Sequence, residues 1–174
     1  MYRPAASAFL LALASATLLS IPASARTGAD PKGEIARVLK RQLKGDFTPH
    51  SPAEIRAAIR PVDINRDGIQ DWQVDFNAFG SAWCGTGGCR YQLWLGRKTG
   101  SPLRVFDRQV REHQSAERQG RIVFVFDFHG TQCGGFGAEA CPGEFTWSPK
   151  RGRMVLLPTA GKRTSTASPV LPFQ

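Results

Sequence analysis

The first third of the chain contains two stretches with the apolar spacing of an amphipathic helix. Between residues 30 and 45, apolar side chains recur every three or four positions, as they do on one face of a helix. These side chains are Ile35, Val38, Leu39 and Leu43. A second, shorter helix is predicted to begin at residues 51–54, where Ser-Pro-Ala-Glu has the form of a capping box with proline at the first helical position. Pro61 is expected to end this helix.

From Trp72 onward, apolar and polar residues alternate with a period of two, which is typical of strands. Strands are predicted over residues 72–77, 90–95, 103–106, 122–128, 145–147 and 154–157. Residues 122–128 are apolar at almost every position, so we expect this strand to be central and buried on both faces. The polar residues 108–120 are expected to form an exposed connection.

These patterns predict one α+β domain over residues 26–157. In this domain the two N-terminal helices pack on a single antiparallel sheet of about five or six strands, which is an ordinary size for a sheet. Residues 158–174 are rich in Pro, Ser and Thr and are expected to form a loose C-terminal tail.

Residues 1–25 have the features of a secretory signal peptide. Arg3 supplies a positive charge, residues 9–19 form an apolar run, and Ala-Ser-Ala at residues 23–25 has the form of a cleavage site. The apolar run is too short to span a bilayer, and no later segment is a candidate for spanning one. The sequence therefore predicts a periplasmic or secreted protein without a transmembrane segment in the mature chain.

The four cysteines are Cys84, Cys89, Cys133 and Cys141, and four cysteines allow three pairings. Disulfide bonds are expected in an exported chain. Because CGTGGC and CGGFGAEAC are each bracketed by two cysteines, we predict the pairs Cys84–Cys89 and Cys133–Cys141. Zinc binding is the alternative, but the four and seven intervening residues differ from the close spacing of most zinc ligand pairs.

An acidic loop precedes the first predicted strand and has the spacing of a calcium site. Calcium takes six to eight oxygen ligands, and Gly68 would let the chain wrap around the ion. The candidate ligands are Asp63, Asn65, Asp67, the carbonyl of Ile69, and Asp71. A complete EF-hand loop has Glu at its twelfth position, where this chain has Val74.

The loop resembles the shorter DxNxDGxxD loops of dockerin-type and integrin-propeller-type calcium sites. In those loops the Asp at the ninth position, here Asp71, takes the chelating role, so the resemblance implies a structural calcium ion. Clustered carboxylates repel one another unless a positive charge neutralises them. The alternative is a metal-free turn of Asp and Asn residues in which Arg66 is the local counter-charge.

The acidic loop, a strand and then CGTGGC follow one another over about residues 60–96. This order resembles a group of small exported proteobacterial proteins of unassigned function. The resemblance implies export and a disulfide hairpin, and it identifies no catalytic residues.

The chain has 23 Lys and Arg against 14 Asp and Glu, a formal net charge of +9. Arg37, Lys40, Arg41 and Lys44 lie opposite the apolar face of the first predicted helix. They form either a binding surface for an anionic partner or simply a solvated face. Nucleic acid is not an expected partner, because the chain lacks a recognition motif and carries an export signal.

Two functional hypotheses follow from the sequence. In the first, the protein is an exported non-catalytic binding or structural module of the bacterial envelope, with an anionic envelope component or an acidic protein as its partner. In the second, it is a small envelope hydrolase. Asp127 and His129 would then form the general base pair on one strand face, with Glu144 approaching from the next hairpin.

Overall fold

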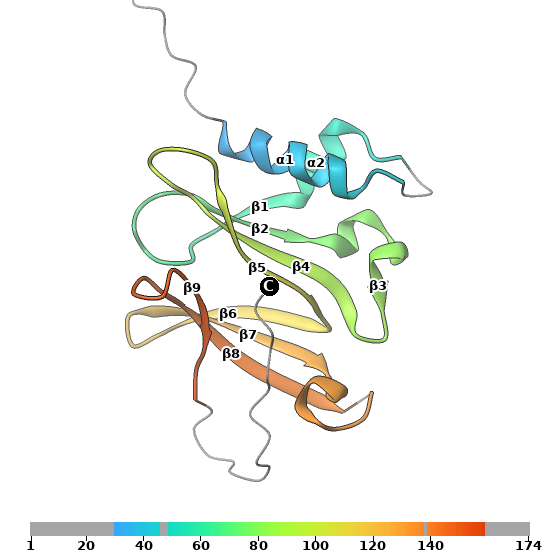
Figure 1. The fold of residues 1–174 in the computed structure, drawn as a ribbon, viewed down its shortest axis with the longest axis vertical. Coiled ribbons are helices and arrows are strands. Elements are labelled where there is room, and N and C mark those ends of the chain that lie inside the picture. Colours follow the sequence, from blue (N-terminus) through green and yellow to red (C-terminus); the bar gives the residue numbers. More distant parts are fainter. Residues whose placement is uncertain (1–29, 46–48, 138, 159–174) are drawn as a thin grey trace, which may run out of the picture.

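The computed structural model describes residues 30–45, 49–137 and 139–158. The predicted signal peptide at residues 1–25 and residues 159–174 of the predicted tail lie outside these ranges. The described chain has an α+β fold with α-helices α1 and α2 and two antiparallel sheets, one of five strands and one of four. In Figure 1 the helices lie above the five-stranded sheet, and the four-stranded sheet lies below it.

Both helices begin with the capping interactions that the sequence predicts. Helix α1 spans Pro31–Gln42, and the Asp30 side chain accepts a hydrogen bond from the backbone N–H of Gly33. Helix α2 spans Pro52–Ala58, and its capping box is complete, since Ser51 and Glu54 each accept a bond from the other's backbone N–H. These bonds satisfy N–H groups that have no partner within the helix.

The prediction that Pro61 ends the second helix is wrong. The helix ends at Ala58, and Pro61 lies within the next strand, β1 (Ile59–Val62). Strand β1 pairs only with β2 and is therefore an edge strand. Proline has no backbone N–H to donate. It is tolerated there because the outer side of an edge strand forms no hydrogen bonds with a neighbouring strand.

The five-stranded sheet contains the first five strands of the chain. Strand β2 (Asp71–Asp75) pairs with β1 and with the long strand β4, which spans Gly88–Leu95. Strand β4 also pairs with the two-residue strand β3 (Cys84–Gly85) and with β5 (Leu103–Val110). Between β2 and β3 lie the short 3-10 helices η1 (Phe76–Phe79) and η2 (Ser81–Trp83).

The four-stranded sheet contains the remaining strands in sequence order. These are β6 (Glu112–Arg118), β7 (Arg121–His129), β8 (Ala140–Ser148) and β9 (Arg153–Leu156). A third 3-10 helix, η3 (Gly130–Cys133), follows β7. The prediction of a single sheet is thus wrong in its count, although the antiparallel pairing is confirmed.

The prediction that residues 108–120 form a connection is also wrong. Strand β5 continues to Val110, and residues 112–118 form β6, in which every residue is exposed. Strand β6 pairs only with β7, so it lies at the edge of its sheet. Charged side chains are common on edge strands, where they oppose pairing with other chains, and this explains the polar sequence.

Aromatic side chains fill the space between the two sheets. The five-stranded sheet contributes Tyr91, Leu93 and Phe106, and the four-stranded sheet contributes a row of phenylalanines. The ring of Phe126 lies 4.3 Å from that of Phe106 in a stacked arrangement, measured between centroids, and is fully buried. The expectation of burial on both faces of residues 122–128 is met only in part, because Val125 is half-buried.

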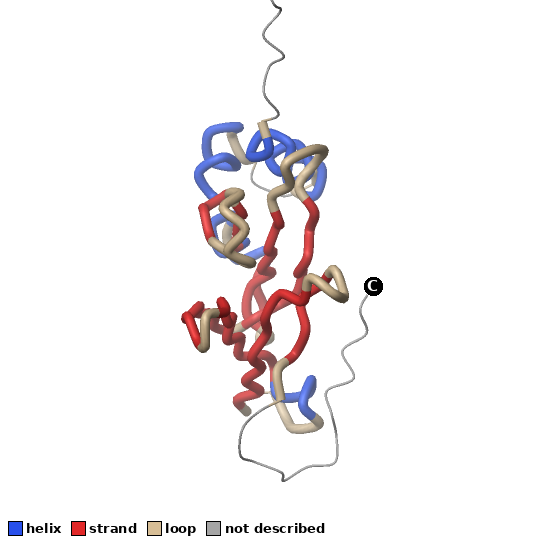
Figure 2. Tube along the Cα trace, turned by 90° about the vertical axis from the view of Figure 1, so that its left-hand side faces the viewer, coloured by secondary structure: helices blue, strands red, loops and turns tan. Residues whose placement is uncertain are grey.

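A second core lies between the helices and the other face of the five-stranded sheet. It joins Ile35, Leu39 and Ile55 of the helices to Val74 and Trp94 of the sheet. The five-stranded sheet is therefore covered on both faces. Figure 2 shows the same arrangement from the side, with α1 and α2 at one end of the molecule and the strands below them.

We expect the Phe126→Ala substitution to destabilise the protein strongly, because it removes a ring buried at the centre of the inter-sheet core. The loss in the free energy of unfolding should be about 3–5 kcal/mol, measured by urea denaturation. The matched control is Phe136→Ala, because Phe136 is 80% exposed. The control should change stability by no more than about 0.5 kcal/mol. Equal losses in the two variants would contradict this description of the core.

Candidate functional site

The acidic loop lies between β1 and β2, and short side-chain bonds give it its shape. The Asp63 carboxylate accepts bonds from the backbone N–H groups of Asn65 (3.2 Å) and Arg66 (2.7 Å). The Asp67 carboxylate accepts bonds from the Asn65 side-chain amide (2.8 Å) and from the backbone N–H of Ile69 (2.8 Å). The sequence pattern thus folds locally into consecutive turns in which Asp and Asn side chains bond to the following backbone.

The structure directs Arg66 away from the loop. Arg66 has a positive φ of 61°, and its guanidinium forms two hydrogen bonds with Glu117 of β6, at 2.9 and 2.7 Å. This exposed ion pair connects the acidic loop to the four-stranded sheet. In the metal-free interpretation Arg66 is the counter-charge of the loop, but in the structure Arg66 pairs with a carboxylate outside the loop.

Asp71 is fully buried and connects the loop to the far end of β4. One carboxylate oxygen accepts a bond from the backbone N–H of Ile64 (2.8 Å), and the other accepts one from Gly96 (2.7 Å). A Cβ atom at position 96 would overlap the Gln70 carbonyl, so glycine is needed for this close approach. Asp71 is thus a cross-link between segments that lie far apart in the sequence.

The pKa of Asp71 is raised to about 6, mainly by burial. The two backbone N–H groups oppose this rise, and the nearby charges of Asp67 and Asp63 add to it. The carboxylates of the loop are therefore close enough to repel one another. Within the described residues, no group of three or more His, Cys, Asp or Glu side chains has the geometry of a metal site. An open hollow of about 400 Å³ lies against the loop and is lined by Asp63, Gly68 and Ile69, among others.

The structure contains two disulfide bonds, Cys84–Cys89 and Cys133–Cys141, and no described cysteine is free. Cys84 and Cys89 are paired across β3 and β4. The second bond joins the end of η3 to the start of β8. Each bond closes one glycine-rich loop and restricts the motion of that loop.

The residues of the predicted hydrolase lie on two neighbouring strands, Asp127 and His129 on β7 and Glu144 on β8, and they bond to different partners. Asp127 accepts a hydrogen bond from the Cys141 backbone N–H at 2.7 Å and lies 3.7 Å from the Arg111 guanidinium. His129 bonds to the Thr131 hydroxyl at 2.8 Å. Glu144 forms an ion pair with Arg118 at 2.6 Å. Among the described residues, Asp127, His129 and Glu144 form no hydrogen bond with one another.

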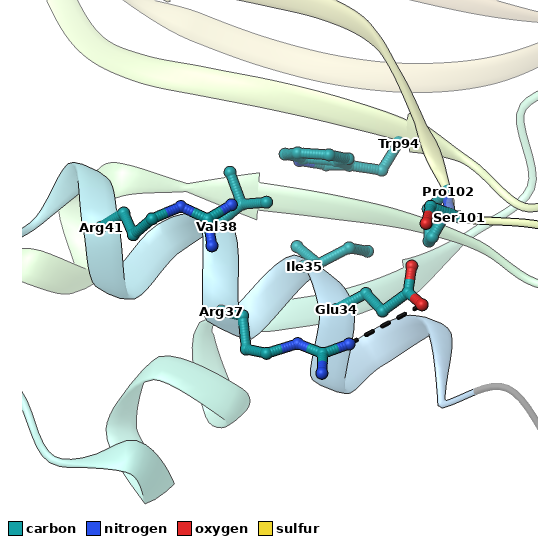
Figure 3. A pocket seen from close by; sticks show the side chains of 8 residues that line it. All are labelled: Glu34, Ile35, Arg37, Val38, Arg41, Trp94, Ser101 and Pro102. Atoms are coloured by element: carbon teal, nitrogen blue, oxygen red, sulfur yellow. Dashed lines mark ion pairs between the residues drawn. The ribbon is translucent and has the colours of Figure 1, made fainter. Parts of the chain in front are cut away.

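The basic residues of α1 lie beside two hollows. One, of about 220 Å³, lies where α1 meets the turn between β4 and β5. Figure 3 shows Ile35 and Val38 pointing toward the Trp94 ring, and the Arg37 guanidinium pointing toward Glu34, 3.7 Å away. This hollow is smaller than most pockets that bind organic ligands.

The larger hollow has a volume of about 610 Å³ and lies between the C-terminal half of α1 and the region around α2. Leu43 and Ile55 contribute to its lining. So do the four basic residues Arg37, Lys40, Arg41 and Lys44. The sequence predicts the basic face but not this hollow. Its walls come from two helices, and no local pattern indicates how the helices meet.

We expect the Asp71 carboxyl to make stability depend on pH. Its pKa is 3.8 before perturbation and about 6 in the folded protein, so between these values the folded state retains a proton that the unfolded state has lost. Its contribution to the free energy of unfolding should therefore decrease as the pH rises through 6. The advantage of the wild type over Asp71→Asn, measured by urea denaturation in EDTA, should be larger at pH 5 than at pH 7.

At pH 5 this advantage should be about 1–3 kcal/mol, because an amide nitrogen cannot accept a bond from a backbone N–H. Glu112→Gln removes an exposed carboxylate and is the control for the loss of one charge. An advantage that is the same at both pH values would show that Asp71 does not titrate in this range.

Among the described residues, no helix is both long enough and apolar enough to cross a membrane. Comparison with known proteins gives no further assignment: no family model matches the chain, and no curated protein or solved structure shows significant similarity to it.

Proposed function

We propose that this protein is an exported, non-catalytic binding module of the bacterial envelope that recognises an anionic envelope component through helix α1. The observation that carries the proposal is a row of cations. Arg37, Lys40 and Arg41 lie on the outer face of α1, and Lys44, in the turn just after the helix, continues their i, i+3, i+4, i+7 spacing. The two disulfide bonds and the sequence features of residues 1–25 support export.

The cations of this row are exposed, and within the described part of the chain Glu34 is the one carboxylate that pairs with any of them. Arg37 lies 3.7 Å from Glu34, and no ion pair is recorded between Lys40, Arg41 or Lys44 and any other described residue. Elsewhere on the described surface, several arginines pair with carboxylates, as Arg66 does with Glu117. A row of cations without internal partners attracts anions, and the remaining positive charge of the chain adds to this attraction.

We also propose that the acidic loop binds a structural calcium ion through Asp63, Asn65, Asp67, the Ile69 carbonyl and Asp71. Two observations support this proposal. Arg66 pairs with Glu117 and not with the loop, and the charges of Asp63 and Asp67 raise the pKa of the buried Asp71. A divalent cation would remove this repulsion and hold the loop against β4 through Asp71.

We expect calcium to raise the melting temperature of the wild-type protein relative to the same protein in EDTA. A shift of about 4 °C corresponds to roughly 1 kcal/mol at this size of domain, and weak extracellular calcium sites respond at millimolar concentrations. Asp67→Ala should abolish the shift. Glu112→Ala removes an acidic residue outside the loop and should retain it. Identical wild-type melting curves in calcium and EDTA would rule out the metal site.

We expect the Lys40→Ala/Lys44→Ala variant to elute from phosphocellulose at a lower salt concentration than the wild type. The matched control is Lys98→Ala/Lys150→Ala, which loses the same net charge from two exposed turns. Charges interact over about 10 Å at 0.1 M salt, so the position of a cation matters as well as the total charge. Equal shifts in the two variants would show that only net charge matters and would contradict the proposed surface.

A further inference from the structure

The geometry points to a ligand site for a single-chain anionic amphiphile, a molecule with one acyl or alkyl chain and a phosphate or carboxylate head, in the 610 Å³ hollow beside α1. This inference rests on the proposed function, because it specifies the anionic partner of the same helix face. It adds that the partner must also have an apolar part.

The volume and position of the hollow suit a small ligand. Pockets that bind organic molecules usually measure about 300–1,000 Å³ and often lie between helices. This hollow is formed by the last turns of α1, the residues Pro49 and His50, and Ile55 of α2. It thus lies between two helices and falls within the usual range of volumes.

The charges at the hollow select for an anion. The lining residues Arg37, Lys40, Arg41 and Lys44 are all cationic, and all four are exposed. The lining contains no Asp or Glu among the described residues. A phosphate or carboxylate at the rim could approach several cations at once, and Arg can bond such a group with two parallel N–H donors.

The floor of the hollow is apolar. Leu43 is 7% exposed and Ile55 is 3% exposed, so these two core residues close the base of the hollow but present little surface themselves. The rest of its apolar surface comes from the other lining residues, including the aliphatic stems of the Lys and Arg side chains. Pro49 adds apolar surface at the edge. A simple anion would leave this surface in contact with water, whereas an alkyl chain would cover it and gain free energy from its burial.

An anionic amphiphile satisfies both parts of the lining. An inorganic anion uses the cations alone, and a neutral chain uses the floor alone. A protein of the bacterial envelope would meet amphiphiles of this kind as single-chain products of anionic lipids. The arrangement also places the head group at the rim, where it stays hydrated while the chain enters the hollow.

The test is isothermal titration calorimetry of the purified full chain with dodecyl phosphate, at concentrations below those at which it forms micelles. We expect saturable binding of one molecule per protein. Inorganic phosphate and the neutral detergent dodecyl maltoside should each bind at least about tenfold more weakly, because each lacks one of the two interactions. Equal binding of phosphate would reduce the site to an anion site, and equal binding of the maltoside would reduce it to an apolar surface, so either result would overturn the proposal.

Two double variants test whether dodecyl phosphate binds at this hollow. Lys40→Ala/Lys44→Ala should weaken the binding of dodecyl phosphate by at least about tenfold, and Lys98→Ala/Lys150→Ala should leave it within about twofold of the wild type. Thermal melts of each variant establish that it folds. Equal weakening in the two variants would overturn the proposal, because binding would then depend only on total charge.

The outcome is separable from that of the proposed function. If phosphocellulose elution depends on Lys40 and Lys44 but dodecyl phosphate does not bind, the anionic surface stands and the amphiphile site is excluded. If elution does not depend on these lysines and dodecyl phosphate does not bind, both proposals are excluded.

Discussion

The fold depends on the burial of strand β4 on both of its faces. Tyr91, Leu93 and Leu95 face the four-stranded sheet, while Gln92 and Trp94 face the helices, so one strand belongs to both cores. The indole N–H of Trp94 bonds to the Gln92 side chain, whose amide bonds in turn to Gln42 of α1. The polar groups of Gln92 and Trp94 are therefore paired, which avoids the free-energy cost of burying them without partners.

The acidic loop is attached to the same strand. Asp71 accepts the backbone N–H of Gly96, directly after β4, and Arg66 bonds to Glu117 on the edge strand of the other sheet. The loop is therefore bonded to both sheets. A calcium ion in the proposed site would neutralise the loop. It would thereby reduce the electrostatic repulsion on the buried Asp71 carboxylate, which bonds to the end of β4.

The proposed anion-binding surface and the hollow beside it lie on the helical side of the five-stranded sheet. Helix α1 buries Ile35 and Leu39 against the five-stranded sheet, and its outer face presents a row of cations beside a hollow with an apolar floor. The strand residues Asp127 and His129 each bond to a neighbouring group. The proposed binding surface is thus supported by a packed sheet, which holds the surface residues in place.

The sequence alone determined the features that depend on nearby residues. The capping box at Ser51, the periodicity of Ile35 and Leu39, and the consecutive Asp and Asn turns of the loop all follow from spacing within a few positions. Only the tertiary structure decided which segments meet. It divided the strands into two sheets, placed Pro61 in an edge strand, paired Arg66 with Glu117 and Asp71 with Gly96, and formed the hollow between α1 and α2. These contacts join residues far apart in the chain, and local periodicity carries no information about which distant segments will share a buried surface.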